Sequence, residues 1–318
     1  MLSLSAFLPL TDGIFVGDRL QKDVQHWLSP PNPSTNQNFV QKARHTGTAA
    51  WFFESSVLTE WKAKGSLLCI HGKRTPFKPP MSPLPNTFVD LKAGAGKSTL
   101  LWVMILYVHQ RLFIVPVRSA IIQEIEHMDA VGLATMAYYY FDFRDVKKQD
   151  CYGLLSSLVF QLSAESDSCY NILSQLYSDN KNGTREPIID SLKECMKDML
   201  NLPGQGPVYI TVDALDECPN LTGTPSAREE VLELIGELVR LELPNLHLCV
   251  ASRPEIDIRL ILDPLTTLKI SLHDETGQKG DIIKYIKFFV DSDRNMQRWN
   301  EDDRQLVVVT LSEKADGM

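Results

Sequence analysis

Short apolar runs alternate with amphipathic patterns along most of this 318-residue chain. Five apolar runs, rich in β-branched and aromatic residues, predict strands at 66–73, 134–143, 208–213, 246–252 and 268–272. Apolar residues that recur at helical spacing predict helices at 47–64, 153–163, 171–178, 188–202, 228–243, 281–290 and 302–314. Strands that alternate with helices in this way favour an α/β fold with a parallel sheet.

Composition and charge narrow the classes of protein. Hydrophobic residues make up 44% of the chain, which is enough for one large core or two small ones. The net charge of −8 gives no electrostatic support to a nucleic-acid partner. The six cysteines form no C-x-x-C pair, so neither a zinc site nor a disulfide framework is expected. This cysteine usage favours a reducing, cytoplasmic location.

One apolar run raises the question of a membrane span. Residues 100–117 are long and apolar, but His109, Gln110 and Arg111 lie at their centre, where charge is most costly in lipid. Residues 1–9 are apolar and lack a basic leader, which argues against a signal peptide. We expect no membrane partner, and anchoring through 100–117 stays as a minor alternative.

A glycine-rich segment carries the first candidate chemistry. Gly94-Ala95-Gly96-Lys97-Ser98-Thr99 resembles the second half of a phosphate-binding loop that runs into a helix. Backbone N–H groups of such a loop point at phosphate oxygens, because glycine leaves no side chain in the way. Lys97 would contact the β- and γ-phosphates, and the Ser98 hydroxyl would bind Mg²⁺. The motif is incomplete, because Leu91 occupies the position of its first glycine.

The missing glycine is found further upstream, at Gly72. Joining Lys73 directly to Ala93 completes the motif, and the residues between them are proline-rich and lack periodicity. We therefore interpret 74–92 as an insertion, such as translated intron sequence, and sequencing of the transcript would test this. Residues 102–118 are a second suspected insertion, because without them 98–101 would continue into 119–128 as one helix of ordinary length.

Acidic residues follow the third predicted strand. Asp213, Asp216 and Glu217 lie within five residues at the carboxyl end of that strand, where ligands bind in open α/β sheets. Asp213 is the candidate for the Mg²⁺ site, and Asp216 or Glu217 would orient the attacking water, with Asp216 preferred. After the fourth strand, Arg253 could contact the γ-phosphate, or it could form a surface ion pair.

These motifs resemble those of a known family. Val208–Cys218, which contains Asp-Ala-Leu-Asp-Glu, is similar to the Walker B motif of NACHT-type signal-transduction NTPases of the STAND class, and 249–254 resemble their sensor 1 strand. Residues 43–61 resemble the lead-in of fungal NACHT proteins with a nephrocystin 3-like N-terminal domain, and 139–145 and 281–286 fit as well. The resemblance implies a P-loop NTPase with a five-stranded, mostly parallel sheet, in which the Walker A strand lies beside sensor 1 and Walker B is next.

The resemblance also implies a function. We expect a lead-in at 1–45, partly disordered, and a NACHT-like domain at 46–318 that binds Mg²⁺ and ATP or GTP, with ATP preferred. It would act as a signalling switch with slow hydrolysis, and it could form homo-oligomers through the NTPase domain. The alternative is a catalytically inactive scaffold, or a mis-spliced fragment of a larger NACHT-repeat protein.

Overall fold

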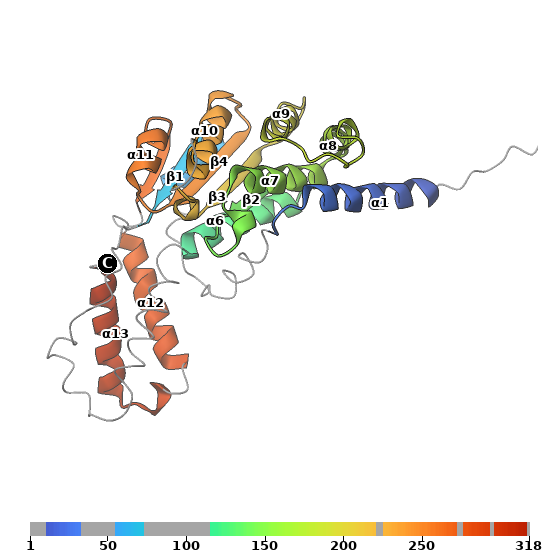
Figure 1. Cartoon of the computed structure of the whole chain (residues 1–318). Coiled ribbons are helices and arrows are strands. Elements are labelled where there is room, and N and C mark those ends of the chain that lie inside the picture. Colours follow the sequence, from blue (N-terminus) through green and yellow to red (C-terminus); the bar gives the residue numbers. More distant parts are fainter. Residues whose placement is uncertain are drawn as a thin grey trace, which may run out of the picture.

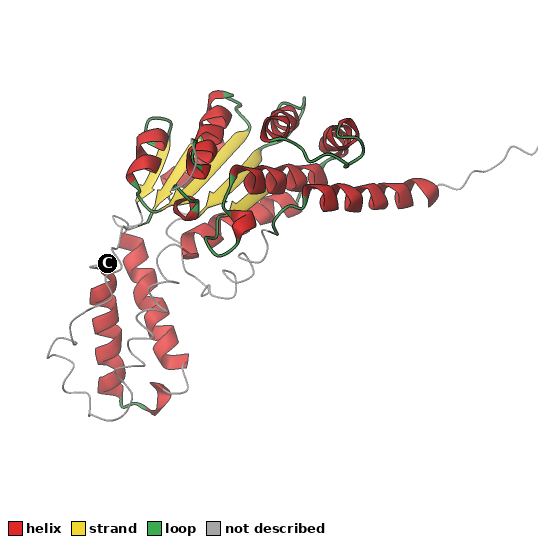
Figure 2. Cartoon of the chain, in the orientation of Figure 1, coloured by secondary structure: helices red, strands yellow, loops and turns green. Residues whose placement is uncertain are grey.

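A five-stranded parallel sheet organises the molecule, with the strand order β2-β3-β4-β1-β5. The computed structural model describes residues 11–32, 55–72, 115–220, 225–271, 276–292 and 296–316. The strands are β1 Leu67–His71, β2 Thr135–Tyr140, β3 Val208–Asp213, β4 Leu246–Ser252 and β5 Leu268–Ser271. Figure 2 shows them in yellow between layers of helices. The predicted α/β fold and its five-stranded parallel sheet are confirmed.

Helices surround this sheet, and most of them were predicted from periodicity. They are α1 Thr11–Leu28, α4 Ser56–Ala63, α6 Val115–Ala130, α7 Cys151–Glu165, α8 Asp167–Asp179, α9 Ile189–Leu200, α10 Ala227–Arg240, α11 Ile256–Leu262, α12 Thr276–Ser292 and α13 Glu301–Asp316. Short 3-10 helices lie at η2 Val146–Lys148, η3 Leu215–Glu217 and η4 Met296–Arg298. Figure 1 shows α10 and α11 on one face of the sheet and α6 on the other.

Alternation of side chains along the strands creates a core on each face of the sheet. In β1, Leu67 and Cys69 face the core formed with α1, α7, α8, α9, α10 and α11. Leu68 and Ile70 face the opposite core, which is formed with α4 and α6. Because successive side chains of a strand point to opposite faces, a strand covered on both sides must be apolar throughout. This explains why β3 and β4 are buried along their whole length.

The structure differs from the sequence-based expectations at three helices. Helix α1 lies inside the predicted lead-in, and its Val24 and Leu28 are buried in the domain core. Helix α6 begins at Val115, so the last residues of the second suspected insertion form its first turn, where a proline is tolerated. Helix α11 was not predicted, because seven residues give too little periodicity to detect.

Helices α12 and α13 follow β5 and lie side by side as a pair that projects away from the sheet (Figure 1). Their mutual contact buries Ile286, Val290, Val307 and Leu311. In the part of the chain that the structure describes, none of the helices has the length and apolar character needed to cross a bilayer. The apolar run 100–117 lies outside the described residues up to position 114.

Candidate functional site

Three predicted strand ends meet at the carboxyl edge of the sheet. Strand β4 pairs with β1 on one side and with β3 on the other, in the order that the resemblance implies. His71 is in register with Ser252, and the Gly72 N–H donates to the Ser252 carbonyl at 3.1 Å. Because all strands are parallel, their carboxyl ends share one edge, and residues 180 positions apart become neighbours.

Asp213 ends β3 and is the innermost carboxylate of this edge. Its side chain is 4% exposed, and its Oδ1 accepts the Ala214 N–H at 2.5 Å. Ala214 has a φ of 55°, the left-handed conformation, and this turn directs the chain from β3 into η3. This conformation is strained for alanine because of its Cβ, and glycine would adopt it more readily. The turn places the next two acidic residues beside the strand ends.

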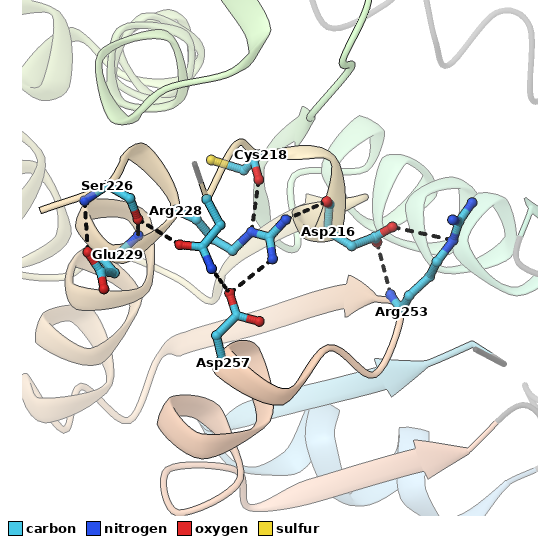
Figure 3. Close-up of polar contacts among 8 residues, drawn as sticks. Asp216, Cys218, Ser226, Arg228, Glu229, Arg253 and Asp257 are labelled. Atoms are coloured by element: carbon cyan, nitrogen blue, oxygen red, sulfur yellow. Dashed lines mark hydrogen bonds and ion pairs between the residues drawn. The ribbon is translucent and has the colours of Figure 1, made fainter. Parts of the chain in front are cut away.

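Asp216 links the β3 end to the β4 end. Its Oδ1 accepts the backbone N–H of Arg253 at 2.9 Å, and its Oδ2 lies 3.4 Å from the Arg253 Nε (Figure 3). The Asp216 side chain is 10% exposed, whereas that of Arg253 is 56% exposed. Asp216 is therefore occupied in holding the next loop. Arg253 forms the ion pair that was one of its two interpretations, and its guanidinium stays accessible from solvent.

Glu217 has the environment of a proton acceptor. Its Oε2 accepts the Phe143 N–H at 3.2 Å. Burial raises the pKa of Glu217 to about 6, the Phe143 N–H opposes this, and the carboxylates of Asp216, Asp142 and Asp213 raise it further. A carboxyl group with a pKa just below neutrality is ionised at pH 7 and still accepts a proton readily.

Asp142 is a fourth acidic residue at this edge, and the sequence analysis did not single it out. It lies just after β2, is 7% exposed and binds the Arg144 guanidinium through two hydrogen bonds of 2.8 Å. The Asp142 carboxylate raises the pKa of Arg144. The signal was present in the sequence, because Asp142 follows an apolar strand as Asp213 does. In the sequence, residues 139–145 contribute only to the family resemblance.

Arg228 was also missed. From the first turn of α10 its guanidinium reaches the carbonyls of Asp216 and Cys218, both at 2.8 Å, and the Asp257 Oδ2 at 2.9 Å (Figure 3). The same Asp257 oxygen accepts from the Asn220 side chain at 2.8 Å. An arginine within a predicted helix carries no sequence signal for such contacts.

The phosphate-loop candidates lie mostly beyond the described residues. Gly72 is the last described residue of its segment, at the end of β1. Six predicted site residues fall outside the described residues, as does the suspected insertion at 74–92: Gly94, Ala95, Gly96, Lys97, Ser98 and Thr99. Of the predicted set, the structure brings together Gly72, Asp213, Asp216, Glu217 and Arg253 at one edge.

A groove of about 670 Å³ lies elsewhere, between α8 and α9. Its walls carry the carboxylates of Asp179, Asp190, Glu194 and Asp198. This concentration of negative charge repels a triphosphate. The groove is therefore not a candidate site for a nucleotide.

The acidic side chains at the carboxyl edge supply only some of the oxygen ligands that Mg²⁺ needs. Within the described residues, no group of three or more histidine, cysteine or acidic side chains is close enough to enclose a metal ion. Mg²⁺ usually binds proteins through one or two carboxylates, with waters and substrate phosphates as the other ligands. Asp213 at the centre of four acidic residues fits that mode, in which the protein supplies few ligands.

Comparisons with known proteins identify a family for this chain. The model of the family described as Nephrocystin 3, N-terminal, matches residues 85–253, more than half of the chain. That span begins inside the first suspected insertion, contains the second and ends at Arg253. No curated protein matches the chain. A chain in a solved structure of Drosophila ORC bound to AT-rich DNA and Cdc6 is similar at 14% identity and a TM-score of 0.27, over 87% of this chain and 59% of that chain.

Proposed function

This chain belongs to the family of nephrocystin 3 N-terminal domains, and from that premise we propose that it binds a magnesium-bound nucleoside triphosphate at the carboxyl edge of the sheet. Hydrolysis is slow, and the bound nucleotide serves as a conformational switch in signalling, as in the NACHT-type NTPases that the motifs resemble. ATP is the preferred nucleotide, and GTP is the alternative. The active unit is the domain at 46–318 together with α1, whose Val24 and Leu28 lie in the same core.

One observation carries this proposal. Gly72, Asp213 and Arg253 stand at the carboxyl ends of β1, β3 and β4, which are adjacent strands of one parallel sheet. Triphosphate hydrolysis needs backbone donors and a lysine for the phosphates, a carboxylate for the metal and a cation near the γ-phosphate. The sequence supplies each of these residue types, and Gly72, Asp213 and Arg253 lie at strand ends. The sheet order makes those three strands neighbours.

Binding is divided between the two sides of the site. The amides of 94–96 and the Lys97 ammonium hold the phosphates, while the Ser98 hydroxyl and the Asp213 carboxylate hold Mg²⁺. When bound, Mg²⁺ neutralises charge on the phosphate oxygens. The Thr99 hydroxyl, at the helix start, adds a donor to the same loop. Arg253 reaches the γ-phosphate with its exposed guanidinium while Asp216 holds its backbone N–H.

Glu217, rather than Asp216, orients and deprotonates the attacking water in this proposal. Asp216 already uses both carboxylate oxygens on Arg253. Glu217 accepts one backbone N–H, and its pKa of about 6 makes it a stronger base than an ordinary glutamate. The sequence analysis had preferred Asp216, because sequence alone did not show which of the two acidic residues is occupied.

Binding of a fluorescent ATP analogue with Mg²⁺ tests the proposed function. Lys97→Ala should abolish saturable binding, because it removes the ammonium that contacts the phosphates. Lys22→Ala, at an exposed position of α1, is the matched control and should bind as the wild type does. Equal binding by wild type and Lys97→Ala would contradict the proposal. Competition by unlabelled ATP and GTP then ranks the two nucleotides.

Deletion of residues 74–92 distinguishes the switch from the inactive scaffold. The scaffold alternative predicts that the full chain binds no nucleotide and that the deletion variant does, because the deletion joins Gly72 to the rest of the motif. Binding by the full chain at the same affinity as the deletion variant would exclude that alternative. Sedimentation of the full chain with and without nucleotide tests the proposed homo-oligomer.

A further inference from the structure

The guanidinium of Arg228 makes three hydrogen bonds beside the candidate site, to the backbone carbonyls of Cys218 and Asp216 and to the Asp257 carboxylate. Its side chain is 12% exposed. It donates to two backbone carbonyls of the loop after β3 and to Asp257 in the first turn of α11. One side chain thereby connects α10, the acidic loop and the segment that follows β4.

Helix stability does not explain this position. The N-terminal turn of a helix favours acidic side chains, because the backbone dipole is positive there. Glu229 and Glu230 in the same turn of α10 follow that rule, and Glu229 forms a capping box with Ser226. Arg228 places a positive charge in this turn, contrary to that rule, so an acidic group outside the helix must balance the charge. Asp257 supplies that balance.

The two carbonyls that Arg228 binds belong to Asp216 and Cys218, the residues on either side of Glu217 (Figure 3). Three-point attachment of a planar guanidinium fixes orientation as well as distance. The backbone of Glu217 is therefore held between two fixed peptide groups. Its carboxylate then lies within hydrogen-bonding distance of the Phe143 N–H.

Asp257 is anchored in turn. Its Oδ2 accepts hydrogen bonds from Arg228 and from the side-chain NH₂ of Asn220. The side-chain Oδ1 of Asn220 accepts from the Ser226 hydroxyl at 2.9 Å. Ser226 is the N-cap of α10. The loop after β3 and the segment after β4 are thus joined in three ways: through Arg228 and Asp257, through Asn220 and Asp257, and through Asp216 and the Arg253 N–H.

We infer that Arg228 and Asp257 are positioning residues for hydrolysis, which fix Glu217 and the backbone of Arg253 relative to each other. This inference rests on the proposed function. Neither residue needs to touch the nucleotide. Loss of the link lets the Glu217 carboxylate move, and a displacement of about 1 Å in a catalytic group can reduce the rate about 100-fold. Nucleotide affinity does not depend on the link, because neither residue is proposed to contact the phosphates or the metal.

Full-chain variants separate this role from a purely structural one. Arg228→Gln removes the charge and the three-point contact, Asp257→Asn keeps the shape and removes the charge, and Arg240→Gln changes an exposed arginine of the same helix. With ATP and Mg²⁺, we expect kcat to fall at least about tenfold in the first two variants, with KM within about twofold of wild type. Arg240→Gln should leave both unchanged.

Combination with Glu217→Gln identifies the group through which Arg228 acts. If Arg228 positions Glu217, adding Arg228→Gln to Glu217→Gln should cause no further loss of rate, because residues that act as a unit are not additive. Independent, additive losses would overturn the inference. So would a rise in KM with kcat unchanged. Arg228→Lys should recover part of the rate, since it restores the charge without the planar fork.

A readout that needs no nucleotide keeps the inference testable by itself. The amides of Phe143 and Arg253 donate to Glu217 and Asp216, and their hydrogen exchange reports whether the loop is held. In Arg228→Gln and Asp257→Asn we expect both amides to exchange about tenfold faster while global stability is retained. Unchanged protection in both variants would overturn the inference. If wild type binds no nucleotide but exchange accelerates as expected, the proposed function fails and the positioning contact stands.

Discussion

The two ends of the sheet each contain a buried histidine, and the two are treated differently. Near the amino end, His247 of β4 is 3% exposed, stacks on Tyr209 at 4.3 Å and places its Nδ1 2.8 Å from the Trp61 carbonyl. At the carboxyl end, His71 of β1 is 6% exposed, and neither ring nitrogen has a hydrogen-bond partner in the described part of the chain. Its nearest acidic group, the Asp263 Oδ1, is 3.9 Å from Nε2.

This contrast shows which end of the sheet is optimised for stability. At the amino end, Trp61 packs edge-on against Tyr209 and His247, its Nε1 donates to the Ser66 carbonyl, and its own carbonyl lies against the His247 Nδ1. At the carboxyl end, the carboxylates of Asp142, Asp213 and Asp216 act on Glu217, and His71 has no hydrogen-bond partner among the described residues. Natural proteins keep such unfavourable arrangements mainly at functional sites. The predictions below test this division.

The largest expected effect is on hydrolysis, at the carboxyl end. Glu217→Gln keeps the shape of the side chain and its acceptor for the Phe143 N–H, but removes the base. We expect a loss in kcat of about 10²- to 10⁴-fold, with nucleotide binding retained. Single-turnover hydrolysis measures this. Asp216→Asn is the comparison: a larger loss there than in Glu217→Gln would restore Asp216 as the base.

The next effect is on stability, at the amino end. Trp61 is fully buried, and Trp61→Ala should lower the free energy of unfolding by about 3–5 kcal/mol, because it leaves a cavity and removes the edge contacts. Denaturant unfolding measures this. Trp27→Ala, at a half-buried position of α1, should cost clearly less. If the two variants lost the same stability, the amino-end cluster would not be the better-packed region.

The Glu217 carboxyl should also make stability depend on pH. Burial raises its pKa from 4.5 to about 6, so the folded protein holds this proton more tightly than the unfolded chain does. Stability from this group is therefore lost as pH rises from about 4.5 to 6, by about 2 kcal/mol in total. Glu217→Gln should recover that amount at pH 7 and show no gain below pH 4.5. A variant that is destabilised at pH 7 would contradict this reasoning.

The smallest effect compares the two histidines directly. Burial lowers the pKa of both, and at His71 the Lys269 and Arg259 cations lower it further while Asp263 opposes them, so both rings are neutral at pH 7. His71→Leu should raise the free energy of unfolding by about 1–2 kcal/mol, because it removes buried polar atoms without partners. His247→Leu should lower it by a similar amount. Thermal unfolding of both variants checks the signs, and equal signs would remove the contrast.

Part of the candidate site could be predicted from sequence. Asp213 and Arg253 each follow a run of apolar residues, and a strand that ends in a charged residue is visible without a structure. The difference between Asp216, which binds Arg253, and Glu217, which accepts the Phe143 N–H, was not visible in the sequence. It depends on the Arg253 N–H, 37 residues away, and on the Phe143 N–H, 74 residues away. Arg228 was missed because its partners, Cys218, Asp216 and Asp257, lie 10, 12 and 29 residues away in the chain. Asp142 was missed although its position after an apolar run is visible in the sequence.

The sequence by itself determined the five strands and most of the helices, because hydrophobic periodicity and strand-end charges are local properties. It also determined the residue types that a triphosphate site needs. Only the tertiary structure decided which carboxylate is occupied and which can accept a proton, because that depends on burial and on N–H groups delivered by neighbouring strands. The tertiary structure also decided that α1 packs into the core and that Arg228 of α10 donates hydrogen bonds to the loop after β3.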